Sequence, residues 1–90
     1  MVRIGIYNYE KSTRPLKKLM VRVGNKVIHF GDTRYGHFKD KTRIWKRLDH
    51  GDSERRKQYR QRTANIRDGD NNLTKDNPLS PNYHARRVLW

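Results

Sequence analysis

The chain has 90 residues, of which 22 are Lys or Arg and 9 are Asp or Glu, so its formal net charge at pH 7 is +13. Only 32% of the residues are hydrophobic, which limits the protein to one small domain with a modest core. The absence of cysteine excludes disulfides and thiolate metal sites. No apolar run approaches the ~18 residues of a membrane span, and the first residues lack the apolar region of a secretory signal. We therefore expect a protein without a membrane span, made in a reducing compartment.

The positive charge is spread along the whole chain. Residues 1–45 carry eleven basic and three acidic side chains, and residues 46–90 carry eleven basic and six acidic ones. A compact chain with this excess repels itself, which indicates an anionic partner. Nucleic acid, an anionic membrane surface and an acidic protein surface all satisfy this requirement.

The first predicted element is a β-hairpin. Residues 19–23 and 26–30 are rich in β-branched and aromatic side chains, and the pair Gly24-Asn25 between them is typical of a two-residue turn. In that register Val21 faces Ile28 and Leu19 faces Phe30, so these four side chains share one buried face.

A third strand is expected over residues 2–7, where Val2, Ile4 and Ile6 alternate with other residues. An isolated hairpin is only marginally stable, so a further strand or a helix must cover it. The sequence predicts a three-stranded sheet, with its strand order left open.

A turn-rich loop is expected over residues 31–42, in which Tyr35 and Phe38 are expected to be buried. A basic helix is then predicted over residues 53–66, with Asp52 or Ser53 as its N-cap.

The 53–66 helix has a narrow apolar stripe, so most of its surface is expected to face solvent or a partner. Tyr59 and Ile66 are expected to anchor it on the sheet. Its cations and one that follows it form the predicted polyanion-contact surface: Arg55, Arg56, Lys57, Arg60, Arg62 and Arg67. The simpler alternative is a solvated helix face.

Residues 67–90 are predicted to form an extended C-terminal arm, because Asn, Asp, Ser and Pro dominate its first half. Apolar side chains at the end of the arm are costly to leave in water. They are predicted to dock on a partner: Tyr83, Val88, Leu89 and Trp90. The predicted fold is α+β in a single small domain (1–90), with a structured nucleus at 19–66 and extended irregular arms.

A metal-dependent nuclease is a further alternative, since the chain has four histidines and several aspartates. They are His29, His37, His50 and His84, with Asp32, Asp40, Asp49 and Asp52. Their spacing matches no zinc signature, and Asp49-His50-Gly51-Asp52 is explained by a turn entering a helix. We therefore expect no enzymatic activity, no cofactor or bound metal, and no small-molecule substrate.

Four parts of the sequence together form a recognisable pattern: residues 28–32, residues 35–42, residues 48–62, and residues 80–83 followed by 88–90. This combination resembles a group of short, basic, largely uncharacterised proteins encoded by large double-stranded DNA viruses of algae and protists. The resemblance covers roughly residues 19–90, and it implies a viral origin more than an activity.

The leading hypothesis is a minor capsid or cement protein of such a virus. It is made in the host cytoplasm or nucleus, located in the virion, and bound to acidic surfaces of other capsid proteins. The alternative is a protein that binds viral DNA without sequence preference and organises the genome. Net charge does not separate the two hypotheses, and the apolar end of the arm favours the first.

Overall fold

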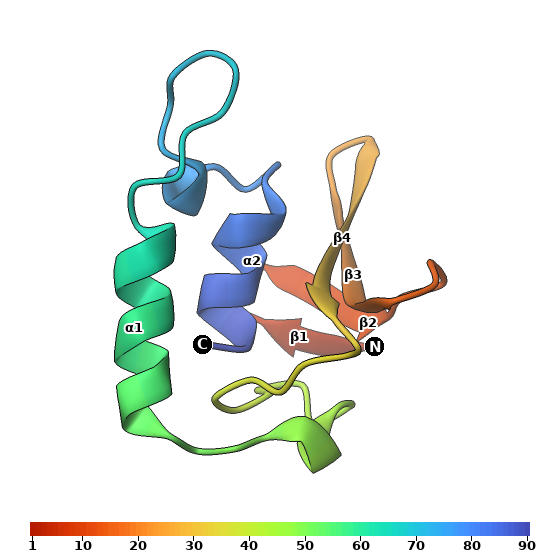
Figure 1. Cartoon of the computed structure of the whole chain (residues 1–90). Coiled ribbons are helices and arrows are strands. Elements are labelled where there is room, and N and C mark those ends of the chain that lie inside the picture. Colours follow the sequence, from red (N-terminus) through yellow and green to blue (C-terminus); the bar gives the residue numbers. More distant parts are fainter.

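A four-stranded antiparallel sheet and two helices form the protein, which the computed structural model describes over residues 1–90 (Figure 1). The strands lie in the order β1-β2-β3-β4. Their bounds are β1 Val2–Ile4, β2 Tyr7–Lys11, β3 Lys17–Val23 and β4 Lys26–Asp32. The helices are α1 Ser53–Thr63 and α2 Pro81–Val88, with short 3-10 helices η1 Lys46–Leu48 and η2 Thr74–Asp76. The α+β class is confirmed, whereas the three-stranded sheet and the single helix were wrong in detail.

The hairpin β3–β4 has the predicted register. Leu19 pairs with Phe30 and Val21 pairs with Ile28, and all four side chains are buried. Gly24 has a positive φ of 61°, as a two-residue hairpin turn requires. The pairing extends beyond the predicted bounds, because β3 begins at Lys17 and β4 ends at Asp32.

The prediction of one strand over residues 2–7 was wrong, because this segment contains a turn. Gly5 adopts a φ of +62°, a conformation open to glycine, and the chain reverses so that Ile4 pairs with Tyr7. Ile6 lies in the turn and is 76% exposed. The alternation of Val2, Ile4 and Ile6 therefore ends at the turn, and Tyr7–Lys11 forms the additional strand β2.

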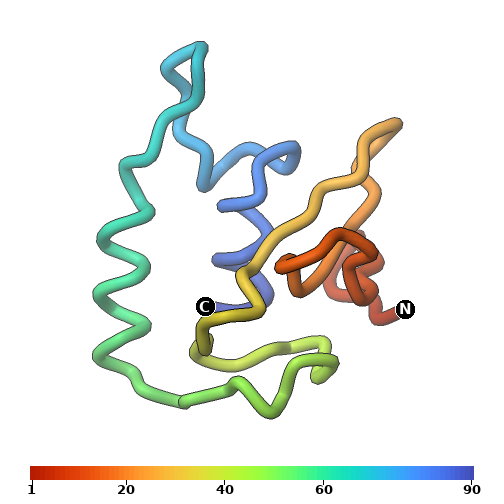
Figure 2. Tube along the Cα trace, turned by 45° about the vertical axis from the view of Figure 1, so that its right-hand side comes forward, coloured from red at the N-terminus to blue at the C-terminus, as the bar shows by residue number.

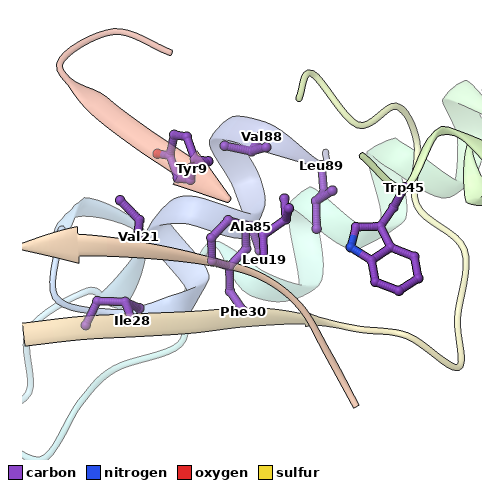
Figure 3. Close-up of a cluster of buried hydrophobic side chains, with 9 residues drawn as sticks. All are labelled: Tyr9, Leu19, Val21, Ile28, Phe30, Trp45, Ala85, Val88 and Leu89. Carbon is purple, nitrogen blue, oxygen red and sulfur yellow. The ribbon is translucent and has the colours of Figure 1, made fainter. Parts of the chain in front are cut away.

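The core lies between the sheet and α2 (Figure 3). The buried apolar side chains come from the sheet, from the loop after β4 and from α2: Tyr9, Leu19, Val21, Ile28, Phe30, Trp45, Ala85, Val88 and Leu89. Residues near both ends of the chain, from Tyr9 in β2 to Leu89 after α2, therefore contribute side chains to the core.

The expected extended arm over residues 67–90 instead contains α2. Ser80 caps this helix by accepting a hydrogen bond from the backbone N–H of Asn82 (3.3 Å), and Pro81 occupies the first helical turn. Ala85, Val88 and Leu89 then lie on one face and are buried. The prediction of an extended arm was wrong because the polar residues before Ser80 end where the cap and the apolar spacing of α2 begin.

His84 fastens α2 to the sheet inside the core. Its Nε2 donates to the Pro78 carbonyl (2.6 Å), so its Nδ1 carries no proton and accepts from the Tyr9 hydroxyl (2.9 Å). Both side chains are fully buried. Burial lowers the pKa of His84 and raises that of Tyr9 to about 12.

Helix α1 lies alongside α2, away from the sheet (Figure 1). Asp52 is its N-cap, as predicted, and accepts from the backbone N–H groups of Glu54 and Arg55. The helix ends at Thr63, before the predicted limit, and Ile66 is 45% exposed rather than packed on the sheet. Neither α1 nor α2 has the length and apolar character needed to cross a membrane.

Candidate anion-binding groove

A groove of about 560 Å³ lies between α1, α2 and the loop that follows β4. Seven of its twelve lining residues are cationic and one is acidic. We call it the basic groove, and its cations are Lys39, Lys41, Arg56, Arg60, Lys75, Arg86 and Arg87, with Asp76 as the single acid. Its apolar lining consists of Ile4, Phe38, Tyr83 and Trp90.

The positive charge of the basic groove is almost uncompensated within the chain. Asp76 pairs with Lys75 at 3.0 Å. No aspartate or glutamate side chain forms an ion pair with the other six cations, because the remaining ion pairs of the protein lie elsewhere. Like charges gathered around a hollow raise the local positive potential, which favours binding of an anion.

Three arginines of the groove hold α1 against α2. Arg86 Nη1 donates to the carbonyl of Arg60 (2.8 Å) and to Thr63 Oγ1 (2.7 Å), and Arg60 Nη1 donates back to the carbonyl of Arg86 (3.3 Å). Arg56 Nε donates to the main-chain oxygen of Trp90 (2.6 Å). Burial, with the Arg86 charge second, lowers the pKa of Arg60.

These contacts leave most guanidinium donors free. Each guanidinium has five N–H donors, and each of these three arginines uses a single nitrogen atom in the hydrogen bonds above. The carbonyls that Arg60 and Arg86 bind fix their positions without neutralising their charge. The groove therefore presents oriented donors to the oxygen atoms of a phosphate or a carboxylate.

Aromatic rings also orient two guanidinium groups of the basic groove, those of Arg56 and Arg87. Arg56 lies 5.2 Å from the ring centre of Phe38, and Arg87 lies 5.1 Å from that of Tyr83. Such cation–π contacts hold the charged group against the wall of the groove. The aromatic lining thus supports the cations and limits their motion.

Lys39 and Lys41 reach the groove because their backbone is bound to the end of α2. The Lys39 N–H donates to the carbonyl of Leu89 (3.1 Å), and the Lys41 N–H donates to that of Val88 (3.0 Å). Alternate residues of an extended segment point to the same side. Asp40, between the two lysines, is buried.

Asp40 organises the loop from the inside. Its carboxylate accepts from the Thr42 N–H (2.8 Å), the Thr42 hydroxyl (2.6 Å) and the Trp45 N–H (2.8 Å). The Trp45 indole N–H donates to the carbonyl of Lys18 in β3 (2.7 Å). Figure 2 shows this segment running from the end of β4 past the end of α2 to the start of α1.

A buried chain of hydrogen bonds joins β3 to the same loop. The Lys18 ammonium, 2% exposed, donates to His37 Nδ1 (2.8 Å), so the proton of His37 lies on Nε2 and is donated to Asp49 (2.5 Å). Asp49 also accepts from the Asp40 N–H (2.8 Å). Burial lowers the pKa of Lys18 to about 8 and also lowers that of His37, on which the Lys18 charge acts second.

The predicted polyanion-contact residues do not form one surface. Arg56 and Arg60 line the basic groove. Arg55 lies 3.7 Å from Asp52, Lys57 and Arg62 are exposed, and Arg67 donates to the carbonyl of Asn71 (2.9 Å) in the loop after α1. The prediction missed the other cations of the groove: Lys39, Lys41, Lys75, Arg86 and Arg87. The sequence does indicate two of them, because Arg86 and Arg87 follow Ser80-Pro81, a pattern typical of a helix start.

The residues expected to dock on a partner lie against their own chain. Val88 is 0% exposed and Leu89 is 1% exposed in the core, so they are not accessible to another protein. Tyr83 and Trp90 are partly buried and line the basic groove. Packing within the chain thus removes these apolar side chains from water, and no partner is needed to cover them.

The histidines considered as metal ligands lie in four separate settings. His37 binds Lys18 and Asp49, and His84 binds Tyr9 and Pro78. His29 contacts the Ser12 hydroxyl (2.7 Å), and His50 Nδ1 accepts from the Asp52 N–H (2.9 Å). No three His, Asp or Glu side chains converge in a way that could hold one metal ion.

Comparison of the chain with models of protein families, with curated proteins and with solved structures finds no match. The basic groove is therefore interpreted from its own geometry and charge.

Proposed function

We propose that the protein binds the sugar–phosphate backbone of a nucleic acid and does not read its base sequence. The observation that carries this proposal is the basic groove, in which six cations have no aspartate or glutamate partner. Phosphate oxygens accept hydrogen bonds from guanidinium and ammonium groups, and release of counterions drives such binding.

A polymeric anion fits the charge distribution better than a small one. Cations outside the groove add to the positive surface of α1, where Arg55, Lys57 and Arg62 are exposed. A single phosphate reaches only the groove, whereas a nucleic acid also contacts these residues. The sequence has no recognisable helix-turn-helix, zinc-finger or RNA-recognition pattern, which agrees with binding without base readout.

The second candidate is a structural role in the particle of a large DNA virus, as a minor capsid protein. The resemblance of residues 19–90 to short basic proteins of large DNA viruses suggests the viral origin. The apolar end of the chain no longer supports this role, since Val88 and Leu89 are buried. The observation that favours it is the apolar exposure of Met1, Ile6 and Val27 around the sheet face opposite α2, which offers a contact to a shell protein. Both roles are compatible in a protein that lies between shell and genome.

The test of the first proposal uses matched charge variants. Lys39, Lys41 and Arg87 are exposed groove residues, and their combined change to Gln removes three charges. The control changes Arg14, Arg22 and Lys26, which are exposed elsewhere, to Gln and removes the same charge. Binding of random-sequence DNA, single-stranded and duplex, is measured by fluorescence anisotropy over a series of salt concentrations.

We expect affinity for at least one form of DNA to fall linearly with salt on logarithmic axes. Removing one cation that neutralises a phosphate lowers the slope by roughly 0.7–0.9. The groove variant is therefore expected to have a slope smaller by about 2, and the control variant keeps nearly the whole slope. Equal decreases in the two variants, or no binding of the unmodified protein at low salt, would refute the proposal.

The second candidate has its own test, mass spectrometry of virus shells from which the genome has been removed. Retention of the protein in empty shells supports a contact with shell proteins. Its loss together with the genome assigns it to the nucleic acid alone.

A further inference from the structure

We propose that the nucleic acid is single-stranded, and that a second hollow beside α1 receives one of its bases. This inference rests on the proposed function and names the substrate class. The hollow measures about 450 Å³, and three aromatic side chains line it: Tyr35, Tyr59 and Trp90. We call it the aromatic hollow. Its charged lining residues are three cations, Lys17, Lys18 and Arg62, and one acid, Asp32.

Tyr35 is the exposed ring of this hollow. It is 65% exposed, although the sequence had suggested a buried position. Its only close ring partner is the Arg34 guanidinium, 5.7 Å from the ring centre. Asp32 holds that guanidinium through hydrogen bonds of 2.8 and 3.1 Å. A large ring fixed at one side and left in solvent is a suitable stacking surface for a nucleobase.

Tyr59 and Trp90 form a rigid wall of the same hollow. Their rings are stacked, with centres 4.2 Å apart and planes 9° apart. Arg62, an exposed residue, lies over Tyr59 with its guanidinium 5.6 Å from the ring centre. Stacking surfaces with nearby guanidinium groups are typical of proteins that bind single strands, because every base has a face that can stack.

The aromatic hollow adjoins the basic groove. Trp90 lines both, while the α1 residues that line them differ. Arg56 and Arg60 face the groove, and Arg62 faces the hollow. With 3.6 residues per turn, Arg60 and Arg62 lie about 160° apart around the helix axis. The two sites therefore open on different sides of α1.

A ligand that occupies both sites must turn past the end of α2, where Trp90 lines both of them. The whole molecule measures only 35 × 29 × 25 Å. Duplex DNA, with a persistence length of about 500 Å, is too stiff to follow such a path. A single strand is flexible enough to make this turn. The exposed Arg55 lies about 20° from Arg62 around the α1 axis, on the side of the hollow, where it can contact a further phosphate. The geometry thus favours a single strand with its phosphates in the groove and a base on Tyr35.

The experiment compares three labelled probes of equal length by fluorescence anisotropy at one low salt concentration: oligothymidylate, a fully abasic strand and a duplex. The abasic strand keeps the phosphates and removes the bases. We expect oligothymidylate to bind roughly tenfold more tightly than the abasic strand, the equivalent of one base stack. Tyr35→Ala is expected to abolish this difference without changing abasic binding, and Tyr35→Phe to keep it.

The outcomes separate this inference from the proposed function. Equal affinity for oligothymidylate and the abasic strand, with salt-dependent binding of both, overturns the base site and leaves backbone binding intact. The base site is also overturned if Tyr35→Ala weakens both strands equally, or if the duplex binds more tightly than the single strand. If no probe binds, both proposals fail together. Tyr35 is exposed, so its substitution is not expected to unfold the protein.

Discussion

Helix α2 faces the sheet with Ala85, Val88 and Leu89, whereas it faces α1 with the Arg86 guanidinium and with main-chain oxygens near its end. On the sheet side, apolar surface is removed from water and the polar His84 is fully hydrogen-bonded. Such contacts depend little on salt.

On the α1 side, arginines of like charge donate to main-chain oxygens, and Thr63 is the only buried residue of α1. Mutual repulsion weakens this arrangement, and a bound anion would relieve it. The sheet side of α2 therefore contributes most of the buried apolar surface that stabilises the fold, and the α1 side is where the proposed polyanion would act.

The largest expected effect comes from breaking the sheet side. Leu89→Ala removes a side chain that is 1% exposed and packs against Gly31 in β4. Loss of a buried leucine with formation of a cavity costs about 2–5 kcal/mol. Urea unfolding measures this change in the free energy of unfolding. Leu79→Ala is the matched control, because Leu79 is 46% exposed and its truncation is expected to be nearly neutral. Similar decreases in the two variants would contradict the assignment of Leu89 to the core.

A smaller effect is expected from the buried ammonium of Lys18. Burial lowers its pKa from the usual 10.5 to about 8, so between these values the unfolded chain binds a proton that the folded chain has released. Stability therefore rises with pH in this window, by at most about 3 kcal/mol. Tyr9 acts in the opposite direction above pH 10, because its pKa is raised to about 12 and the unfolded chain loses its proton first.

The measurement is the free energy of unfolding from pH 7 to pH 10, with Lys18→Met as the comparison. The variant lacks the titrating group, so its stability is expected to stay level where that of the unmodified protein increases. A flat profile for the unmodified protein, or an equal rise in the variant, would show that the ammonium is not buried as described.

Local signals explain what could be predicted from the sequence. The turn Gly24-Asn25 and the alternating side chains around it determine the β3–β4 register, and the short polar side chain of Asp52 determines the start of α1. The strand β2 was missed because Ile6 continues an alternating pattern through a turn that Gly5 creates. Pattern alone does not distinguish such an exposed turn residue from a buried strand residue.

The basic groove could be predicted only in part, because its cations come from segments far apart in the chain. Arg56 and Arg60 were found from their position on a basic helix. Lys39 and Lys41 enter the groove only because their N–H groups bind the carbonyls of Leu89 and Val88, contacts that join residues about fifty positions apart. The apolar end of the chain was misinterpreted for the same reason, since its partner is the sheet of the same molecule.

The smallest expected effect compares the caps of the two helices. Asp52→Ala removes the acceptor of two N–H groups in α1, and Ser80→Ala removes the acceptor of one in α2. Loss of a cap typically costs about 1 kcal/mol. In α2 this cost is expected to appear in global unfolding, because the helix is part of the core. In α1 it is expected to appear as local fraying, since the helix opens without disturbing the sheet.

Measuring both hydrogen exchange of the α1 amides and thermal unfolding distinguishes local fraying of α1 from global unfolding. Asp52→Ala is expected to speed exchange at residues 56–58, the first hydrogen-bonded amides of α1, with almost no change in melting temperature, while Ser80→Ala lowers the melting temperature by a few degrees. An equal fall in melting temperature for both variants would mean that α1 unfolds together with the sheet. In that case the two sides of α2 would not differ in their contribution to stability, and a polyanion would act on the whole fold rather than on α1 alone.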